Sequence, residues 1–165
     1  MAPRHRIRKL LFGDLNEDYF SLLCELSGDN QPLTKKIIQS CWDNYIDNLD
    51  HCTFVCEDTP KQLNLGEYLP INRSGTIIGT ASVLIEHKML HYGSKVGHIE
   101  DVVVSSNAWR LGIGNALIQK CIDFCRDSRC YKIILDCSDK NISFYERCGF
   151  KLIENCMRID LKYDS

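Results

Sequence analysis

A short apolar strand that leads through a glycine turn into an amphipathic helix constrains this sequence most. Residues 102–104 are three valines, and residues 110–115 read Arg-Leu-Gly-Ile-Gly-Asn. The first N–H groups of a helix have no acceptor inside the helix, and the helix dipole adds positive charge there. Gly112 and Gly114 would let a ligand approach the backbone closely. The segment therefore predicts a cradle for an anion such as a pyrophosphate.

The same glycine spacing occurs in dinucleotide-binding domains and in simple turns. Leu117 occupies the third small position of the dinucleotide pattern. The turn also lies in the last third of the chain, after the strands of a predicted hairpin, and not in a first strand–helix–strand unit. Both features argue against a dinucleotide site and leave simple turn chemistry as the other interpretation.

Hydrophobic periodicity and turn residues predict the remaining elements. Asp14 is the expected N-cap of the first helix, and Pro32 is expected in the first turn of the second. The nearly continuous apolar run over 131–137 predicts a strand buried on both faces. Residues 58–75 are predicted to form a long irregular connection. The expected strands are 4–12, 53–56, 76–87, 97–104, 131–137 and 150–161, and the expected helices are 15–26, 32–47, 112–129 and 141–147. This order predicts an α/β domain around a mixed sheet.

Length and composition suit one soluble domain over residues 1–165. The net charge of -2 argues against a general nucleic-acid binder, which usually carries a basic excess. No stretch approaches the roughly 20 apolar residues of a membrane span, and the N-terminus lacks the apolar run of a signal peptide. We therefore expect a cytoplasmic protein without a membrane span.

The ten cysteines are scattered along the chain without a C-x-x-C pair. Zinc sites usually need closer paired ligands, so we expect no metal site. A disulfide framework is not expected without a secretory signal. Most of these thiols are predicted to serve as small apolar core side chains.

Three stretches carry a resemblance to a known family. Residues 141–150, Asn-Ile-Ser-Phe-Tyr-Glu-Arg-Cys-Gly-Phe, follow the strand–turn–helix–strand order and resemble the GNAT superfamily of N-acetyltransferases. Residues 97–104 and 130–137 narrow the resemblance to the eukaryotic glucosamine 6-phosphate N-acetyltransferases. The close resemblance spans about residues 76–150. It implies a mixed, mostly antiparallel central sheet flanked by α-helices.

The resemblance also implies an activity. The chain would transfer acetyl from acetyl-CoA to the amine of glucosamine 6-phosphate, on the way to UDP-N-acetylglucosamine, and would work as a homodimer without a metal. The amine would attack the thioester directly, through a tetrahedral intermediate. Such a reaction needs a proton acceptor for the amine and a proton donor for the leaving thiolate, but no covalent enzyme intermediate.

Residue roles follow from the resemblance as well. The backbone of the strand at residues 102–104 would pair with the pantetheine arm, and the glycine turn would hold the pyrophosphate. Two residues of the 141–150 stretch would lie near the thioester. The implied cofactor-binding residues are Val102, Val103, Val104, Arg110, Leu111, Gly112, Ile113, Gly114, Asn115, Asn141 and Tyr145.

Tyr145, Asp136 and Glu100 are the implied catalytic residues. Tyr145 would protonate the thiolate or hydrogen-bond its sulfur, and Asp136 would orient or polarise the amine. The implied substrate-binding residues are Lys88, His91, Glu100, Asp101, Tyr131, Lys132, Ser27 and Arg158. Lys88 and Lys132 supply the cationic groups that a sugar phosphate requires.

Three positions depart from the family pattern. Trp109 stands where the superfamily turn usually has Gln or Arg, Ser27 stands for an expected threonine, and Arg158 is offset from an expected C-terminal arginine. Two other functions stay open at this point. One is acetylation of another amine, such as a protein N-terminus, a lysine or a polyamine. The other is a non-catalytic acyl-CoA-binding module.

Overall fold

The computed structural model describes residues 5–28, 33–46, 48–58 and 75–161. The chain divides into two units, Met1–Leu135 and Asp136–Ser165, and each is described by itself. Residues 59–74 of the connection predicted over 58–75, and Pro32, lie outside the described residues. The prediction of one domain over the whole chain stays a prediction.

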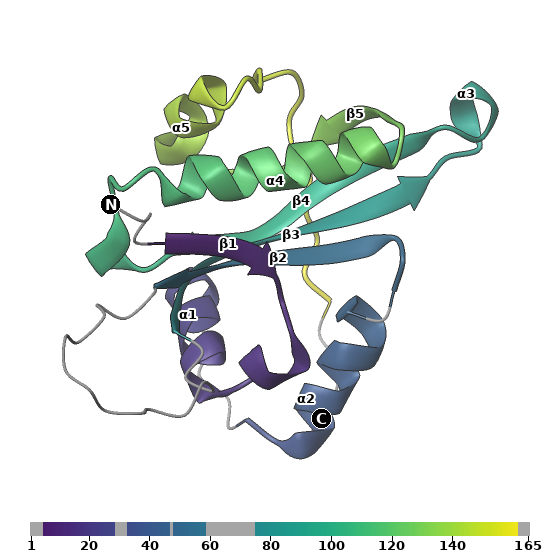
Figure 1. Cartoon of the computed structure of the whole chain (residues 1–165). Coiled ribbons are helices and arrows are strands. Elements are labelled where there is room, and N and C mark those ends of the chain that lie inside the picture. Colours follow the sequence, from purple (N-terminus) through teal and green to yellow (C-terminus); the bar gives the residue numbers. More distant parts are fainter. Residues whose placement is uncertain (1–4, 29–32, 47, 59–74, 162–165) are drawn as a thin grey trace, which may run out of the picture. The chain divides into compact units, whose positions relative to one another are not determined.

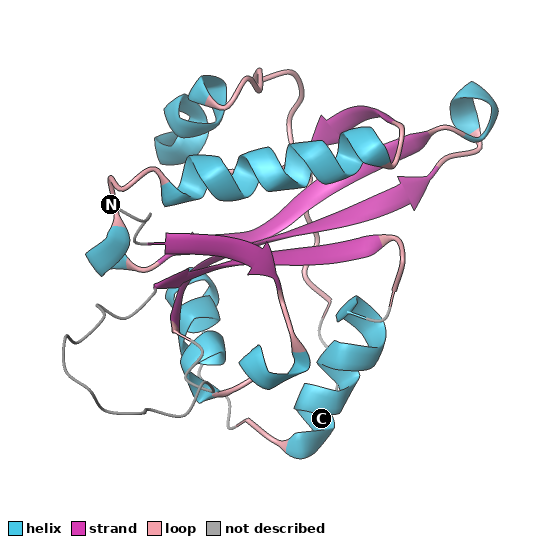
Figure 2. Ribbon diagram, in the orientation of Figure 1, coloured by secondary structure: helices cyan, strands magenta, loops and turns pink. Residues whose placement is uncertain are grey.

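The first unit is built on a five-stranded sheet with the strand order β1-β2-β3-β4-β5 (Figures 1 and 2). Neighbouring strands are antiparallel, except that β4 and β5 are parallel. The predicted mixed, mostly antiparallel sheet is therefore confirmed. The strands are β1 (His5–Lys9), β2 (His51–Asp58), β3 (Thr76–His87), β4 (Lys95–Val104) and β5 (Cys130–Ile134).

Helices cover both faces of this sheet. Helix α4 (Ile113–Asp127) lies on one face, whereas α1 (Glu17–Ser27) and α2 (Lys35–Cys41) lie on the other (Figure 1). Helix α2 continues into a π-helical turn, Trp42–Ile46. A short helix, α3 (Leu90–Gly93), forms the tip of the β3–β4 hairpin. No helix in the described ranges is long and apolar enough to cross a membrane.

Helix α4 packs tightly on the sheet through its predicted apolar face. Leu117, Ile118, Cys121 and Cys125 are fully buried. A Cβ atom at Gly97 of β4 would lie 2.2 Å from the Cys125 sulfur, so only glycine permits this approach of helix and strand. This packing fixes the start of α4 relative to the end of β4, where the anion cradle is predicted.

A second apolar cluster lies between the sheet and α1. Its members include Leu15, Tyr19 and Leu22, as the helical spacing predicts, together with Val55 and Val103 of the sheet. Four of the ten cysteines, Cys52, Cys56, Cys121 and Cys125, are buried, whereas the other six are half-buried or exposed, so the prediction that most of the thiols serve as core side chains holds for fewer than half of them.

The second unit contains a 3₁₀ turn, Asp139–Asn141, and α5 (Ile142–Arg147). The Tyr145 ring is buried, with its centroid 4.9 Å from that of Phe144 and 6.1 Å from that of Phe150. The strand predicted over 150–161 is wrong, because residues 150–161 carry no ladder hydrogen bonds and are irregular.

The prediction of Asp14 as an N-cap is also wrong. Asn16 caps α1 by accepting a hydrogen bond from the Tyr19 N–H. Asp14 instead ends a 3₁₀ turn, Phe12–Asp14, and binds the Arg8 guanidinium through both carboxylate oxygens, at 2.5 and 2.9 Å. The strand predicted over 4–12 is shorter than expected: it ends at Lys9, before the 3₁₀ turn that contains Asp14.

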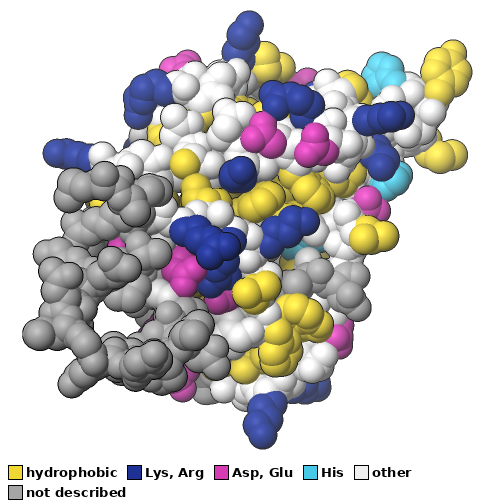
Figure 3. All heavy atoms as spheres, in the orientation of Figure 1, with side chains coloured by type: hydrophobic (Ala, Val, Ile, Leu, Met, Phe, Trp, Pro, Cys, Tyr) yellow, Lys and Arg dark blue, Asp and Glu magenta, His cyan; other side chains and the backbone are white. Residues whose placement is uncertain are grey.

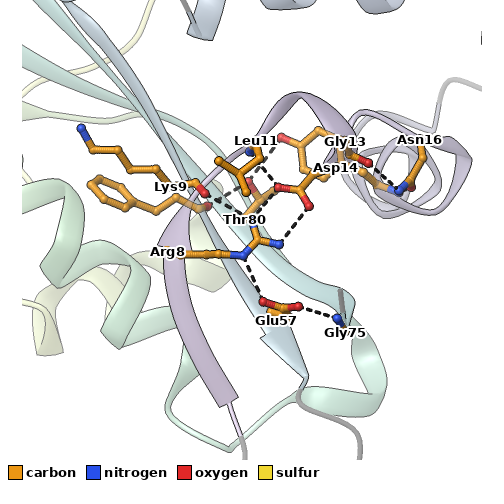
Figure 4. Close-up of polar contacts among 11 residues, drawn as sticks. Arg8, Lys9, Leu11, Gly13, Asp14, Asn16, Glu57, Gly75 and Thr80 are labelled. Carbon is orange, nitrogen blue, oxygen red and sulfur yellow. Dashed lines mark hydrogen bonds and ion pairs between the residues drawn. The ribbon is translucent and has the colours of Figure 1, made fainter. Parts of the chain in front are cut away.

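Arg8 joins three segments of the first unit (Figure 4). Its Nε donates to Glu57 of β2 at 3.0 Å while its terminal nitrogens bind Asp14, and Glu57 also accepts a hydrogen bond from the Gly75 N–H. Desolvation acts to raise the pKa of Asp14, but hydrogen bonds from Arg8 and the Leu11 N–H, with the Arg8 charge, lower it overall. The ion pair therefore holds the entry to α1 on the sheet.

Two further expectations differ from the structure. No residue of β5 is fully buried, because Cys130 and Ile133 are half-buried and the other three are exposed, and β5 ends at Ile134, so the strand predicted over 131–137 with two buried faces is wrong. The parallel ladder pairs β5 only with residues Lys95 to His98 of β4, and it stops where β5 ends. Helix α2 begins after Thr34, whose side chain accepts from the Ile37 N–H.

Replacement of Arg8 by alanine should lower the free energy of unfolding by about 3 kcal/mol at pH 7, because the buried carboxylate of Asp14 and the half-buried carboxylate of Glu57 would lose their cation. The pKa of Asp14 is depressed in the folded protein, so its contribution is complete above the unfolded pKa and disappears as the pH falls through the folded value. The loss caused by Arg8→Ala should therefore shrink in acid. Urea unfolding from pH 7 downward measures both effects.

The matched control is Arg126→Ala. Arg126 also pairs with a carboxylate, Asp123 at 2.8 Å, but on the exposed surface of α4, and its removal should cost below about 1 kcal/mol. Equal losses for the two variants would contradict the role assigned to Arg8.

Candidate active site

One edge of β4 lacks a neighbouring strand within the described part of the first unit. The ladder with β5 stops at His98, but β4 continues to Val104. Backbone N–H and C=O groups need partners, and an unpaired strand edge offers a row of them to an extended ligand. The edge after His98 is therefore suited to receive a chain that bears amide groups.

The hydrogen-bond pattern identifies which groups face this edge. The Ser105 N–H donates to the Ile78 carbonyl at 2.9 Å, and Val103 lies opposite Thr80. Because antiparallel ladders alternate, the polar backbone groups of Val103 and Ser105 face β3, whereas those of Val104 face the unpaired edge. Val103 instead contributes its buried side chain to the α1 cluster.

A β-bulge reshapes β4 beside this edge. Thr80 pairs with Val103 and Ser82 with Glu100, so Asp101 and Val102 together lie opposite Ala81 alone. Asp101 adopts a left-handed conformation with φ of 51°. Bulges redirect side chains and often lie beside active sites. Here the bulge interrupts the regular alternation of side chains along the strand, next to the carboxylates of Glu100 and Asp101.

The glycine turn follows directly. A 3₁₀ turn, Ser106–Ala108, is followed by Arg110 and Gly112, both with positive φ, and Gly112 caps the start of α4. The first backbone hydrogen bond of α4 runs from the Ala116 N–H to the Gly112 carbonyl at 3.0 Å. The N–H groups of Ile113 and Gly114 come before this first bond and therefore have no acceptor within the helix, as an anion cradle requires.

A hollow of about 560 Å³ adjoins this turn from the α1 side. Leu111 and Ser105 line it, but so do the carboxylates of Asp18, Glu25 and Asp58. Acidic side chains repel a diphosphate, so the N-terminus of α4 is the better site for that anion. The hollow is distinct from the predicted cradle.

Desolvation raises the pKa of Asp101, and the nearby His51 acts in the opposite direction. The charge of Asp101 in turn contributes, after desolvation, to raising the pKa of Tyr19 to about 12. The Tyr19 hydroxyl lies 3.4 Å from that of Thr80, which is buried under the bulge. The protonated form of Asp101 is therefore favoured more than is usual for a carboxyl group.

The β3–β4 hairpin carries the predicted phosphate-binding lysine. Lys88 Nζ lies 2.5 Å from one oxygen of Glu86, whose other oxygen lies 2.7 Å from Nε2 of His98. The hydrogen bonds from Lys88 and His98 lower the pKa of Glu86. Lys88 is thus already paired with the carboxylate of Glu86, and an incoming phosphate would compete with that carboxylate for the Lys88 ammonium group.

His91, Tyr131 and Lys132 are brought together at the tip of the same hairpin. The His91 ring lies 4.9 Å from the Tyr131 ring, and Lys132 Nζ lies 5.8 Å from the Tyr131 ring centre. His91 and Tyr92 both have positive φ, an uncommon conformation outside glycine. Apolar and histidine side chains project there (Figure 3).

Ser27 lies apart from this group. It ends α1, which packs on the beginning of β3 and the end of β4, whereas Lys88 and His91 follow the far end of β3 (Figure 1). Within one copy of the chain, the structure does not bring Ser27 beside Lys88.

The remaining predicted site residues belong to the second unit. Asn141 precedes α5, and Tyr145 lies on it with the aromatic contacts given above. Asp136 accepts a hydrogen bond from the Cys156 thiol at 3.4 Å, and Arg158 pairs with Asp160 at 2.6 Å. Arg158 therefore already has a carboxylate partner in the structure.

Sequence reasoning missed two features of the site. The indole N–H of Trp109 donates to the Val104 carbonyl at 2.7 Å, which joins the turn to the end of β4. Glu86 connects Lys88 and His98, although neither spacing nor alternation singles it out. Only the cross-strand register, which places residues 86 and 98 close together, reveals that contact.

The described arrangement matches a known family. The model of the Acetyltransferase (GNAT) family matches residues 34–150. The chain belongs to this family. The match confirms the GNAT resemblance drawn from residues 141–150, and it makes the chain an acetyltransferase.

Curated relatives within the GNAT family include proteins named for one substrate. The chain is 34% identical over 154 residues to "Glucosamine 6-phosphate N-acetyltransferase" of Arabidopsis thaliana, an alignment that covers 90% of this chain and 91% of the relative. It is 47% identical over 88 residues to the protein of the same name in Trypanosoma brucei brucei, covering 53% of this chain and 60% of that relative.

Solved structures agree on the fold. The crystal structure of glucosamine-6-phosphate N-acetyltransferase from Arabidopsis thaliana has a TM-score of 0.79 and 31% identity, and the match covers 98% of this chain and 100% of that one. A predicted acetyltransferase from Clostridium acetobutylicum, solved with acetyl-CoA, has a TM-score of 0.70 at 16% identity, covers 94% of this chain and 96% of its own, and supports the fold alone.

Proposed function

We propose that this GNAT enzyme is a glucosamine 6-phosphate N-acetyltransferase, which transfers acetyl from acetyl-CoA to the sugar amine. The unpaired edge of β4, ending at the N-terminus of α4, is the observation that carries the proposal. The names of the full-length plant relative and of its crystal structure support the choice of substrate. The product is an N-acetyl amino-sugar phosphate, a precursor for UDP-N-acetylglucosamine.

The residues present fit acetyl-CoA. An added Cβ at Gly112 would meet no atom within 4 Å other than those of its chain neighbours, so the protein leaves open space beside the turn at this residue. Residues 110–115 would hold the diphosphate there, and the backbone of Val102 and Val104 would pair with the amide-bearing pantetheine arm. Acetyl-CoA supplies the activated acetyl group.

The protein supplies position and proton transfer. Glu100 and Asp101 would hold the amine and sugar hydroxyls, and Asp136 would orient the amine. A carboxylate, directly or through water, accepts the proton that the amine loses when it attacks. The Tyr145 hydroxyl donates a proton or hydrogen bond to the departing sulfur. Asn141 would lie near the thioester.

The sugar phosphate requires cations. Lys88, His91 and Lys132, with the ring of Tyr131, lie around the hairpin tip in the first unit. Basic and acidic side chains are interspersed on the face drawn in Figure 3. A compact group of cations suits one small phosphorylated ligand better than a long polyanion.

Thiol release from acetyl-CoA should occur with glucosamine 6-phosphate and fall strongly when the 6-phosphate is absent, because the hairpin cations then lose their ligand. The assay compares this sugar with glucosamine, a polyamine, a lysine peptide and a peptide N-terminus. Faster turnover of a peptide or polyamine would assign the enzyme to another amine. Failure to bind coenzyme A at all would overturn the proposal.

Tyr145→Phe and Asp136→Ala should each lower kcat by about 100-fold, in line with the loss of one proton-transfer group. Coenzyme A affinity, measured by calorimetry, should change little. Tyr92→Phe and Asp123→Ala are the matched controls, because Tyr92 is fully exposed at the hairpin tip and Asp123 pairs only on the surface of α4. Unchanged rates in both site variants would point to a non-catalytic acyl-CoA-binding module.

We also propose that the enzyme is a cytoplasmic homodimer. The family resemblance supports the dimer, and the ten cysteines, all free thiols, support a reducing compartment. Sedimentation of the purified protein should give the mass of two chains over the assay concentrations. A single-chain mass throughout that range would contradict the dimer, and a fluorescent fusion found in an organelle would contradict the location.

A further inference from the structure

Trp109 makes a specific contact that burial does not explain. The side chain is 65% exposed, yet its indole N–H donates to the Val104 carbonyl at 2.7 Å. An exposed tryptophan that served only to cover apolar surface would have no need of an aligned hydrogen bond. The contact therefore points to a role at the junction of β4 and the glycine turn.

The acceptor lies at the critical point of the strand. Val104 is the last residue of β4, and its carbonyl faces the unpaired edge. The N–H groups of Ala108 and Trp109 bond to the carbonyls of Ser105 and Ser106, at 2.8 and 3.4 Å. The indole bond thus closes the whole stretch from Val104 to Trp109 into one compact loop.

The residues that follow need such an anchor. Arg110 has φ of 65°, and a non-glycine residue in this region costs about 1 kcal/mol or more. On its helix side the turn is held by the buried Ile113 and Leu117 of α4. On its strand side, the side-chain contact that the structure provides is the bond from Trp109 to Val104.

We propose that Trp109 is a positioning residue for coenzyme A, an inference that rests on the proposed function. Its N–H fixes the strand side of the turn, so that the N–H groups at the start of α4 are aligned before the ligand arrives. The same bond occupies one lone pair of the Val104 carbonyl and leaves the Val104 N–H for the pantetheine arm. The donor, not the aromatic ring, carries this role.

Side-chain chemistry offers a sharp test. Phenylalanine keeps a ring but has no N–H donor. Glutamine has no ring, but its amide nitrogen is as many bonds from Cα as the indole nitrogen, so it can restore the donor. Trp42→Phe is the matched control, because Trp42 packs edge-on against Phe12, with ring centroids 5.1 Å apart, away from the turn.

Calorimetry with coenzyme A should show about three- to tenfold weaker binding for Trp109→Phe, as expected for the loss of one hydrogen bond. Amide hydrogen exchange over residues 105–114 of the ligand-free variant should be faster. The KM for acetyl-CoA should rise while kcat and the KM for glucosamine 6-phosphate stay unchanged. Trp109→Gln should restore most of the affinity, and Trp42→Phe should match the wild type.

Wild-type affinity and exchange in Trp109→Phe would overturn the proposal. So would a Trp109→Gln variant that binds as weakly as Trp109→Phe, because the ring would then be the important group. If the wild-type protein itself fails to bind coenzyme A, the proposed function fails. The exchange measurement on ligand-free protein would still decide whether Trp109 orders the turn.

Discussion

The early end of β5 beside β4 is the constraint on which the functional part of this structure depends. The two strands share a parallel ladder only up to His98, and β4 runs on to Val104. Beyond that point, within the described residues of the first unit, the strand has polar groups on one edge with no strand beside them. A sheet that stayed fully paired would offer no backbone groups to a ligand, whereas this one ends in an edge that leads directly to a helix N-terminus.

Packing on both faces of the sheet holds the unpaired part of β4 in place. Gly97 lets α4 approach β4 at the paired end of the strand, and Val103 anchors the unpaired end in the α1 cluster. Arg8 then secures α1 itself through Asp14. The position of the cradle is therefore set by a glycine, an apolar side chain and a buried ion pair, none of which needs to touch a ligand.

Sequence patterns predicted the elements that depend on local information. β3 has the bounds expected from its apolar pattern, and α4 has the expected buried face. Predictions failed where a distant residue decides the outcome. Asp14 is a good N-cap by local preference, but the charge of Arg8 draws it elsewhere, and Asn16 takes its place. Strands also depend on partners, and for that reason the sequence pattern over 150–161 was a poor guide.

The site shows the same division in its chemistry. Residues 102–104 and 110–115 were found because a strand, two glycines and a helix are visible in sequence. The bulge at Asp101 was not, since no glycine marks the residue that takes the left-handed φ. Trp109 looked like a departure from a Gln-or-Arg position. The side chains of glutamine, arginine and tryptophan each carry an N–H group on a nitrogen that is the same number of bonds from Cα. The residue type at this position can therefore change while the hydrogen-bond donor to the Val104 carbonyl is kept.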